Sequence, residues 1–298
     1  DRRTGFLRGE VEQALGTAHA DCAARFRVPF ATSPATAFPP PGPLALLSPD
    51  ATWGCFPDAN GLAIGYGRDG KAYLFTANGG TDDVSVIDLE RALKGDRLAE
   101  ILRIPTQIGP WGIVASPDGR HIVAANRESQ RVAFEGNTIS IIDVERARVG
   151  RPDAEVARVR VGTDSDTVQT RPFIPSFTPD GKLIIVPNFR SNNVSLVSLE
   201  KALSAEPAEV ARIPLTRPPQ AEPDGVAPRP ARPKGSAVTS DGRYAVISGG
   251  PRVTLRPFRP TGTVWIIDLQ LKPPAVVATV TGVGNDPYGL ALVERGGD

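Results

Sequence analysis

The feature that most constrains this chain is a hairpin unit that recurs along it. Each copy carries an Asp-Gly pair, a strong tight-turn signal, followed by an apolar and β-branched run that should pair back on the run before the turn. The four pairs begin at Asp69, Asp118, Asp180 and Asp241, so successive turns lie 49, 62 and 61 residues apart. A spacing of this kind indicates a repeat architecture.

Each copy also contains a third and a fourth β-branched run. The third runs lie at 83–90, 138–145, 193–200 and 263–270, and the fourth read LAEILRI, EVARVRV, EVARIPL and AVVATVT. Four short strands per unit are typical of a β-propeller blade, and one blade cannot bury both of its faces alone. An ordinary antiparallel sandwich is the alternative, but it gives no reason for the same runs to return in the same order.

The units resemble the YVTN-type β-propeller repeat, which runs as aromatic-Val-Ala-Asn, a polar turn, Asn-Thr-Val-Ser-Val-Ile-Asp, a variable arm, Pro-x-Gly and Ser-Pro-Asp-Gly. The matching segments are 75–78 with 84–88, 124–126 with 138–143, and 187–188 with 193–197. Segments 110–112, 233–235 and 287–289 fill the Pro-x-Gly slot, whereas 172–174 has Ile in place of Gly. The resemblance covers about Gly61 to Glu294 and implies an all-β propeller of four-stranded antiparallel blades. For function it implies only a choice among binding proteins, dehydrogenase subunits and lactonase-like enzymes.

The sequence predicts an N-terminal extension, residues 1–58, and a propeller, residues 59–298. Within the extension we expect a short helix in 1–25, strands at 25–31 and 44–48, and a polyproline-like connector at 34–43. Pro287-Tyr288-Gly289 begins a further unit, and the two N-terminal strands are expected to complete that blade and remove its open edges. This count predicts five blades, whereas the family resemblance favours seven.

Composition excludes several classes of partner. The net charge of +1 gives no field to recruit nucleic acid, and no run of 18 apolar residues could span a bilayer. The chain starts at Asp1 and contains no Met, from which we expect a removed secretion signal and a periplasmic or extracellular location. In that setting Cys22 and Cys55 are expected to form a disulfide, with two free thiols as the alternative.

Catalytic residues are not predicted. A hydrolytic nucleophile needs a base, usually His, and the two histidines are His19 on the predicted helix and His121 at the start of a strand. No haem-attachment or zinc motif occurs, so no cofactor is expected in this chain. Asp164 and Asp166 offer alternating oxygen ligands that could hold calcium, but the distal Glu of an EF-hand is missing and a solvated turn is the favoured reading.

A binding face is the stronger prediction. In a propeller, two kinds of link lie on the same face. One joins the fourth, outermost strand of a blade to the first, innermost strand of the next blade, and the other joins the second and third strands within a blade. The predicted ligand- or partner-binding residues on that face are Trp111, Arg127, Arg171, Phe173, Arg190, Lys234, Arg252 and Tyr288. Arginine presents a planar fork suited to carboxylate or phosphate. The alternative is that these cations pair with Glu128, Asp166 or Asp286 and only solubilise the rim.

The sequence therefore favours an exported binding or scaffold module that docks a protein partner or an anionic small ligand on its loop-rich face. The alternative is an enzyme or enzyme subunit: a lactonase-like hydrolase, or the non-haem subunit of a periplasmic dehydrogenase complex. The hydrolase requires acid and base groups near the channel, for which Glu128, Asp164, Asp166 and Asp286 are the available residues.

Overall fold

The computed structural model describes residues 58–293, except 97, 129–133, 219–228 and 252–260. The predicted N-terminal helix, connector and two strands lie outside the described residues, as do His19, the Cys22–Cys55 disulfide and Arg252.

The described residues form an all-β structure of four antiparallel sheets, here called blades 1 to 4, each with its four strands in chain order. Blade 1 contains β1 (Ala59–Tyr66), β2 (Ala72–Asn78), β3 (Asp83–Asp88) and β4 (Glu100–Pro105). Blade 2 contains β5 (Pro110–Ala115), β6 (His121–Glu128), β7 (Glu135–Asp143) and β8 (Glu155–Arg160). Blade 3 contains β9 (Ser176–Phe177), β10 (Leu183–Asn188), β11 (Asn193–Ser198) and β12 (Glu209–Pro214). Blade 4 contains β13 (Pro233–Val238), β14 (Tyr244–Gly249), β15 (Thr263–Asp268) and β16 (Ala275–Thr281).

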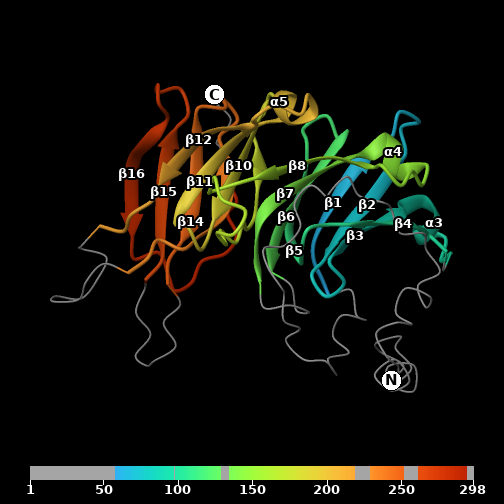
Figure 1. Ribbon diagram of the computed structural model, residues 1–298, viewed down its shortest axis with the longest axis horizontal. Helices are drawn as coiled ribbons and strands as arrows, with labels where there is room; N and C mark the ends of the chain where they lie inside the picture. The colour runs from blue at the N-terminus through green and yellow to red at the C-terminus, as the bar shows by residue number, and fades with distance from the viewer. Residues whose placement is uncertain (1–57, 97, 129–133, 219–228, 252–260, 294–298) are drawn as a thin grey trace, which may run out of the picture.

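Figure 1 shows the blades side by side in chain order, from blade 1 at one end to blade 4 at the other. The arrangement is consistent with a β-propeller, and the predicted four-stranded antiparallel unit is confirmed four times. The five-blade count and the closure of the ring stay predictions.

The Asp-Gly turns join the first and second strands of every blade, as the sequence predicts. Each turn glycine has a positive φ, between 68° and 74°, which glycine adopts without steric cost. The turn aspartate accepts a hydrogen bond from the backbone two residues on, as in Asp118 Oδ1 with Arg120 N at 3.0 Å. The same contact recurs at Asp69, Asp180 and Asp241.

Each third strand ends two residues earlier than its apolar run, and in three blades a one-turn helix begins at that point. These helices are α3 (Leu89–Leu93), α4 (Val144–Arg148) and α5 (Leu199–Leu203). The last strand residue caps each helix: Asp88, Asp143 and Ser198 accept from the backbone N–H three residues on. The chain therefore passes directly from the third strand into a helix, at the end of the blade that carries the Asp-Gly turn.

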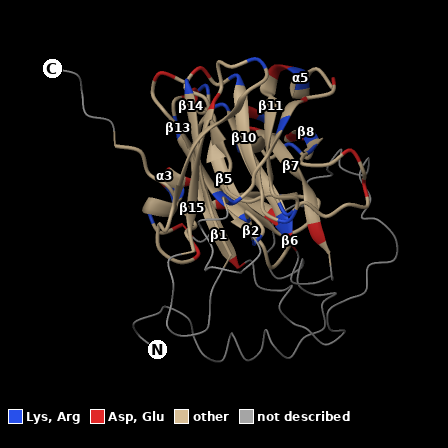
Figure 2. Cartoon of the chain, turned by 90° about the vertical axis from the view of Figure 1, so that its left-hand side faces the viewer, with Lys and Arg blue, Asp and Glu red and all other residues tan. Residues whose placement is uncertain are grey.

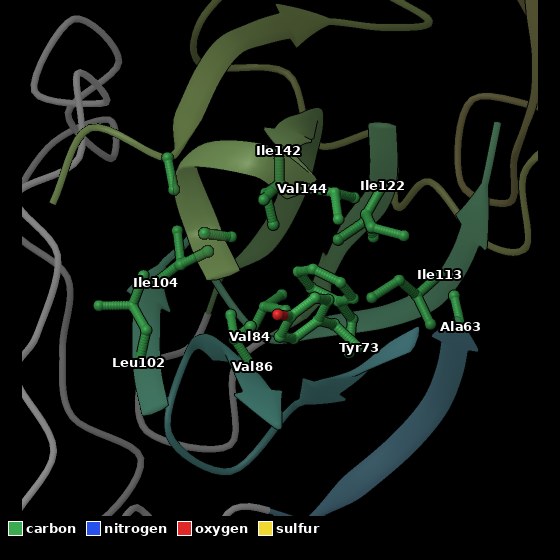
Figure 3. Close-up of a cluster of buried hydrophobic side chains, with 14 of the residues drawn as sticks. Ala63, Tyr73, Val84, Val86, Leu102, Ile104, Ile113, Ile122, Ile142 and Val144 are labelled. Carbon is green, nitrogen blue, oxygen red and sulfur yellow. The ribbon is translucent and has the colours of Figure 1, made fainter. Parts of the chain in front are cut away.

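The hydrophobic core lies between neighbouring blades. Figure 3 shows the cluster between blades 1 and 2, where Val84 and Val86 of β3 face Ile122 of β6 and Ile142 of β7. Similar clusters fill the spaces between blades 2 and 3 and between blades 3 and 4. Many of the charged residues lie near the ends of the strands (Figure 2).

Each of blades 1, 2 and 3 contains a polar ladder that runs from near the end of its second strand, through its third strand, to the first residue of its fourth strand. In blade 3, Asn188 Nδ2 donates to Ser195 Oγ at 2.7 Å, and Ser195 Oγ donates to Glu209 Oε1 at 2.5 Å. Glu209 in turn pairs with Arg212, three residues along β12. Blade 1 repeats the ladder with Asn78, Ser85, Glu100 and Arg103, and blade 2 repeats it with Asn126, Ser140, Glu155 and Arg158. The Glu-x-x-Arg spacing in the fourth runs is the sequence signal of this ladder.

Blade 4 replaces the ladder with apolar packing. By register, Trp265 occupies the place of Ser140, and Val276 and Thr279 occupy the places of Glu155 and Arg158. The Trp265 side chain is buried, and its indole N–H donates to the Thr216 carbonyl at 2.7 Å. One position in the fold thus accepts either a buried ion pair or an indole, provided that every polar atom finds a partner.

Replacing Glu155 by Val should lower the free energy of unfolding by about 3–5 kcal/mol, because Arg158 would remain buried without its carboxylate. The double variant E155V/R158T, which copies Val276 and Thr279, should recover most of the loss. Urea unfolding measures both, with Glu200→Gln on the exposed face of α5 as the control. A single variant as stable as the double one would contradict this role of the ion pair.

Candidate functional site

Four equivalent side chains meet at the end of the blades opposite the Asp-Gly turns. They are the middle residues of the Pro-x-Gly slots: Trp111, Phe173, Lys234 and Tyr288. The Phe173 ring centroid lies 6.1 Å from that of Trp111 and 5.5 Å from that of Tyr288, and Lys234 Nζ lies 5.0 Å from the Tyr288 ring. The sequence repeat therefore places these four residues in one cluster.

Glycine in the Pro-x-Gly slot permits this convergence. A Cβ on Gly112 would clash with the Phe173 carbonyl oxygen, and a Cβ on Gly235 would clash with the Tyr288 carbonyl oxygen in the same way. Each slot thus packs directly against the backbone of the next. At the slot where Ile174 replaces glycine, the Ile174 N–H donates to the Lys234 carbonyl at 3.0 Å.

Arg127 is one of the buried cations at this end. Its guanidinium lies 4.1 Å from the Trp111 ring and 4.6 Å from the Phe173 ring, and the residue is 6% exposed. Burial lowers the pKa of Arg127 to about 10, and the neighbouring charge of Arg171 acts in the same direction, opposed by Glu128.

Phe189, just after β10, collects three further cations around one ring. Arg232 and Arg171 lie 4.7 and 4.9 Å from its centroid, and Lys234 Nζ lies 5.5 Å from it. A cation over an aromatic face is attracted by the ring quadrupole, and more strongly where water is excluded. Phe189 therefore stabilises a concentration of positive charge that would otherwise repel itself.

An alternating chain of ions joins blades 2 and 3. Glu128 pairs with Arg127 at 2.5 Å and with Arg171 at 2.6 Å. Glu135 pairs with Arg171 at 2.9 Å and with Arg190 at 2.8 Å. The two glutamates face each other across the β6–β7 pair, where like charges repel, and Arg171 neutralises both.

Lys234 is held separately from this chain. The residue is 1% exposed, donates to the Gly250 carbonyl at 2.9 Å and forms an ion pair with Asp286. Burial lowers the Lys234 pKa below its usual value, partly offset by Asp286, while Arg232 and Arg171 lower it further.

Three residues that immediately precede a proline have unusual backbone angles: Arg171, Arg232 and Asp286 have φ of 53°, 51° and 58°. Positive φ is uncommon outside glycine and marks strain that the surroundings must hold. The backbone N–H of Arg171 donates to the Gly136 carbonyl at 2.8 Å, and that of Arg232 donates to Asn192 Oδ1 at 3.0 Å. All three strained residues contribute charge to the same site.

These residues define the aromatic–cation cluster. Its members are Trp111, Phe173, Phe189, Tyr288, Arg127, Arg171, Arg190, Arg232, Lys234, Glu128, Glu135 and Asp286. It holds five cations against three carboxylates. Among the described residues Arg232 has no carboxylate within 4.0 Å, and the Arg190 side chain is 52% exposed. Burial lowers the pKa of Arg232, and Arg190 adds to the effect.

The structure brings together seven of the eight predicted binding residues, and Arg252 lies outside the described residues. The expected pairing of these cations with Glu128 and Asp286 is also present, whereas Asp166 pairs with Arg160 instead. The sequence reading missed Phe189, Glu135 and Arg232. Arg232 could have been found, since it precedes Pro233 as Arg171 precedes Pro172. That these residues bind a ligand stays a prediction.

The calcium suggestion gains no support from the side-chain contacts. Asp164 pairs with Arg212 at 2.9 Å and Asp166 pairs with Arg160, so the two carboxylates are engaged by different arginines. In the part of the chain that the structure describes, no group of three or more His, Cys, Asp and Glu residues could hold a metal ion.

A groove of about 560 Å³ lies at the rim between β8 and the segment from α5 to β12, away from the aromatic–cation cluster. Its lining includes Arg158 and Glu209, which belong to the polar ladders of blades 2 and 3. Because these groups already serve the fold, we place the candidate site at the aromatic–cation cluster.

Comparison with known proteins assigns no family. No protein-family model and no curated protein sequence matches the chain. Among solved structures, the chain is similar to the Pseudomonas aeruginosa periplasmic gluconolactonase, with 16% identity and a TM-score of 0.49. The match covers 78% of this chain and 58% of that one, so this chain spans less than two thirds of its length. Among the described residues no helix is long and apolar enough to cross a membrane.

Replacing Arg171 by Ala should lower the free energy of unfolding by about 3 kcal/mol, because Glu128 and Glu135 would then face each other without the shared guanidinium. Arg171→Lys keeps the charge but lacks the planar fork, so an intermediate loss is expected. Arg190→Ala, at the exposed end of the ion chain, should cost less than about 1 kcal/mol. Equal losses at positions 171 and 190 in urea unfolding would refute the bridging role of Arg171.

Proposed function

We propose that this chain is a binding module that holds an oxyanion, the carboxylate or phosphate group of a small ligand or of a partner protein, on the aromatic–cation cluster. The observation that carries the proposal is the excess of cations: five positive side chains share three carboxylates, and Arg232 lies over Phe189 without one. Burial is the main cause that lowers the pKa of Arg232 and Lys234, and neighbouring arginines add to it; an arriving oxyanion would relieve this added repulsion.

The accessible part of the cluster supports a position for this oxyanion. Arg190 is half-exposed, and its charge acts on Arg232. The hydrogen bond from Arg232 N to Asn192 ties Arg232 to the loop that carries Arg190. The two guanidinium groups therefore come from neighbouring segments joined by this hydrogen bond, with Arg232 over the Phe189 ring, and could make charge-assisted hydrogen bonds to one oxyanion.

The contacts favour binding over general base catalysis. Glu128 accepts from two arginines, Asp286 pairs with Lys234, and Asp164 and Asp166 pair with arginines as well. A carboxylate whose oxygens already contact arginine or lysine is not positioned to take a proton from a substrate. We therefore propose no hydrolytic function.

Membership in the YVTN-type repeat family is part of the same proposal. The four copies of the blade, the Pro-x-Gly packing and the Asn–Ser–Glu ladder support it. A closed propeller ring would place the aromatic–cation cluster at the mouth of its central channel, where ligands of ring-shaped proteins have access from one face.

Sulfate is a suitable probe for the oxyanion site, and isothermal titration calorimetry at low ionic strength should show one saturable site. Arg232→Gln should weaken sulfate binding about tenfold, the loss of one charge-assisted hydrogen bond. Arg243→Gln, which removes a cation paired with Asp268 at the opposite end of blade 4, is the matched control and should leave the affinity unchanged. Equal weakening by both variants would indicate a general charge effect and would overturn the proposal.

The affinity for sulfate should fall between about pH 8 and about pH 10, whereas sulfate itself keeps its charge over this range. The physical reason is that the pKa of Lys234 lies below its usual value and that of Arg127 lies at about 10, so the aromatic–cation cluster loses positive charge earlier than an exposed lysine or arginine would. Titrations at the two pH values measure the effect. An affinity that stays constant would mean that neither cation contributes to the site.

A further inference from the structure

Blade 4 differs from the other three blades in the link that follows its third strand. In blades 1, 2 and 3 this link begins with a one-turn helix, α3, α4 or α5. In blade 4 the link consists of residues 269–274 and contains no helix. Pro273 and Pro274 are incompatible with a helix interior, because proline lacks the N–H and its ring clashes with the preceding turn. Asp268 therefore caps a turn, and its Oδ1 accepts from the Gln270 N–H at 2.9 Å.

The helix of blade 2 shows what such a helix does for the preceding blade. Val144 and Ala147 of α4 are buried in the cluster between blades 1 and 2. Arg148, at the end of the same helix, pairs with Asp69 in the Asp-Gly turn of blade 1 at 3.2 Å. The helix therefore covers apolar side chains between two blades and places a cation beside the turn aspartate of the first one.

Between blades 3 and 4 the corresponding place is a pocket of about 490 Å³. Leu183 at the start of β10 and Leu269 at the end of β15 supply apolar side chains to its lining. The turn aspartates of the two blades, Asp180 and Asp241, also line it, together with Gln270. We call this space the blade 3–4 pocket. It lies at the end of the blades that carries the Asp-Gly turns, opposite the aromatic–cation cluster.

The repeat explains why this pocket is open. The Leu269 N–H donates to the Arg243 carbonyl at 2.8 Å, just as the Val144 N–H donates to the Arg120 carbonyl at 3.0 Å, so the two links start in the same position. Five residues after the third strand, however, blade 2 has Arg148 and blade 4 has a proline. The blade 3–4 pocket thus lacks both the helix and the cation that its counterpart contains.

Both aspartates of the blade 3–4 pocket are charged at neutral pH. Hydrogen bonds from Thr178 and Thr239 lower the pKa of Asp180 and Asp241, respectively. Lys182 Nζ lies 3.6 Å from Asp180, but its side chain is 80% exposed, and an exposed pair of this kind contributes little. The pocket therefore combines apolar side chains with negative charge.

We propose that the blade 3–4 pocket binds a small organic cation, an amidinium, guanidinium or amine group attached to an apolar body. Leu183 and Leu269 contact the apolar body and Asp180 pairs with the cationic group, as Asp69 pairs with Arg148 of α4. The volume lies within the range of about 300–1,000 Å³ that is usual for small-molecule pockets. This site is separate from the proposed oxyanion site and selects the opposite charge.

Benzamidine is a suitable probe, because it joins a planar cation to one phenyl ring. Isothermal titration calorimetry should show one saturable site, and benzamide, which has a similar shape and no charge, should bind at least tenfold more weakly. Asp180→Asn keeps the oxygen that accepts the hydrogen bonds of the turn and removes the charge, so it should weaken benzamidine binding about tenfold.

Asp118→Asn is the matched control. It makes the same change in the Asp-Gly turn of blade 2, where α5 of the next blade packs Ala202 into the space, and it should leave the affinity for benzamidine unchanged. Arg232→Gln should also leave it unchanged, so this proposal and the oxyanion proposal can fail separately. Absence of benzamidine binding, equal affinities for benzamidine and benzamide, or equal weakening by Asp180→Asn and Asp118→Asn would overturn the proposal.

A labelling experiment tests the pocket with Asp180 left in place. Gln270→Cys is treated with two thiosulfonate reagents, one carrying a trimethylammonium group and one carrying a sulfonate, and peptide mass spectrometry separates position 270 from Cys22 and Cys55. Relative to free cysteine, the cationic reagent should react at least fivefold faster than the anionic one, and benzamidine should slow its reaction. Equal relative rates, or no protection by benzamidine, would contradict a cation-selective pocket.

Discussion

The packing of one blade on the next is the constraint on which the rest of this structure depends. Neighbouring sheets bury apolar side chains against each other in three clusters, and a blade alone would expose these side chains to water. Burial between neighbours drives the stack, and the strand ends are left for polar groups (Figure 2). The turn chemistry, the helix caps and the charged cluster are all arranged around that stack.

Close packing also explains why charge accumulates at one end. The Pro-x-Gly slot sets each innermost strand against the backbone of the next, and so the side chains between Pro and Gly must converge. At this convergence Phe173 and Lys234 are each 1% exposed. A buried cation stays charged only if an aromatic face, a carboxylate or a ligand stabilises it. The aromatic–cation cluster supplies aromatic faces and carboxylates.

The two ways of filling the blade interior illustrate how far the repeat can vary. Blades 1 to 3 bury a hydrogen-bonded Glu–Arg pair, whereas blade 4 buries Trp265 at the equivalent place. Burial raises the pKa of the Glu155 carboxyl, a sign that the ion pair only partly offsets the cost of desolvation. The ladder therefore specifies the register of the strands more than it adds stability.

The sequence alone determined the strand order, the turns and most members of the aromatic–cation cluster, because these follow from period-2 alternation, Asp-Gly turns and a repeated slot. It did not determine the one-turn helices after the third strands, since the caps lie inside runs that read as strand. Nor did it determine the ion chain. Glu135 and Phe189 belong to the site because both contact the Arg171 side chain, and Arg171 has a left-handed backbone conformation that the sequence does not reveal. Local patterns specify which residues form a strand, whereas the partners of a charge depend on blades that are distant in sequence and adjacent in space.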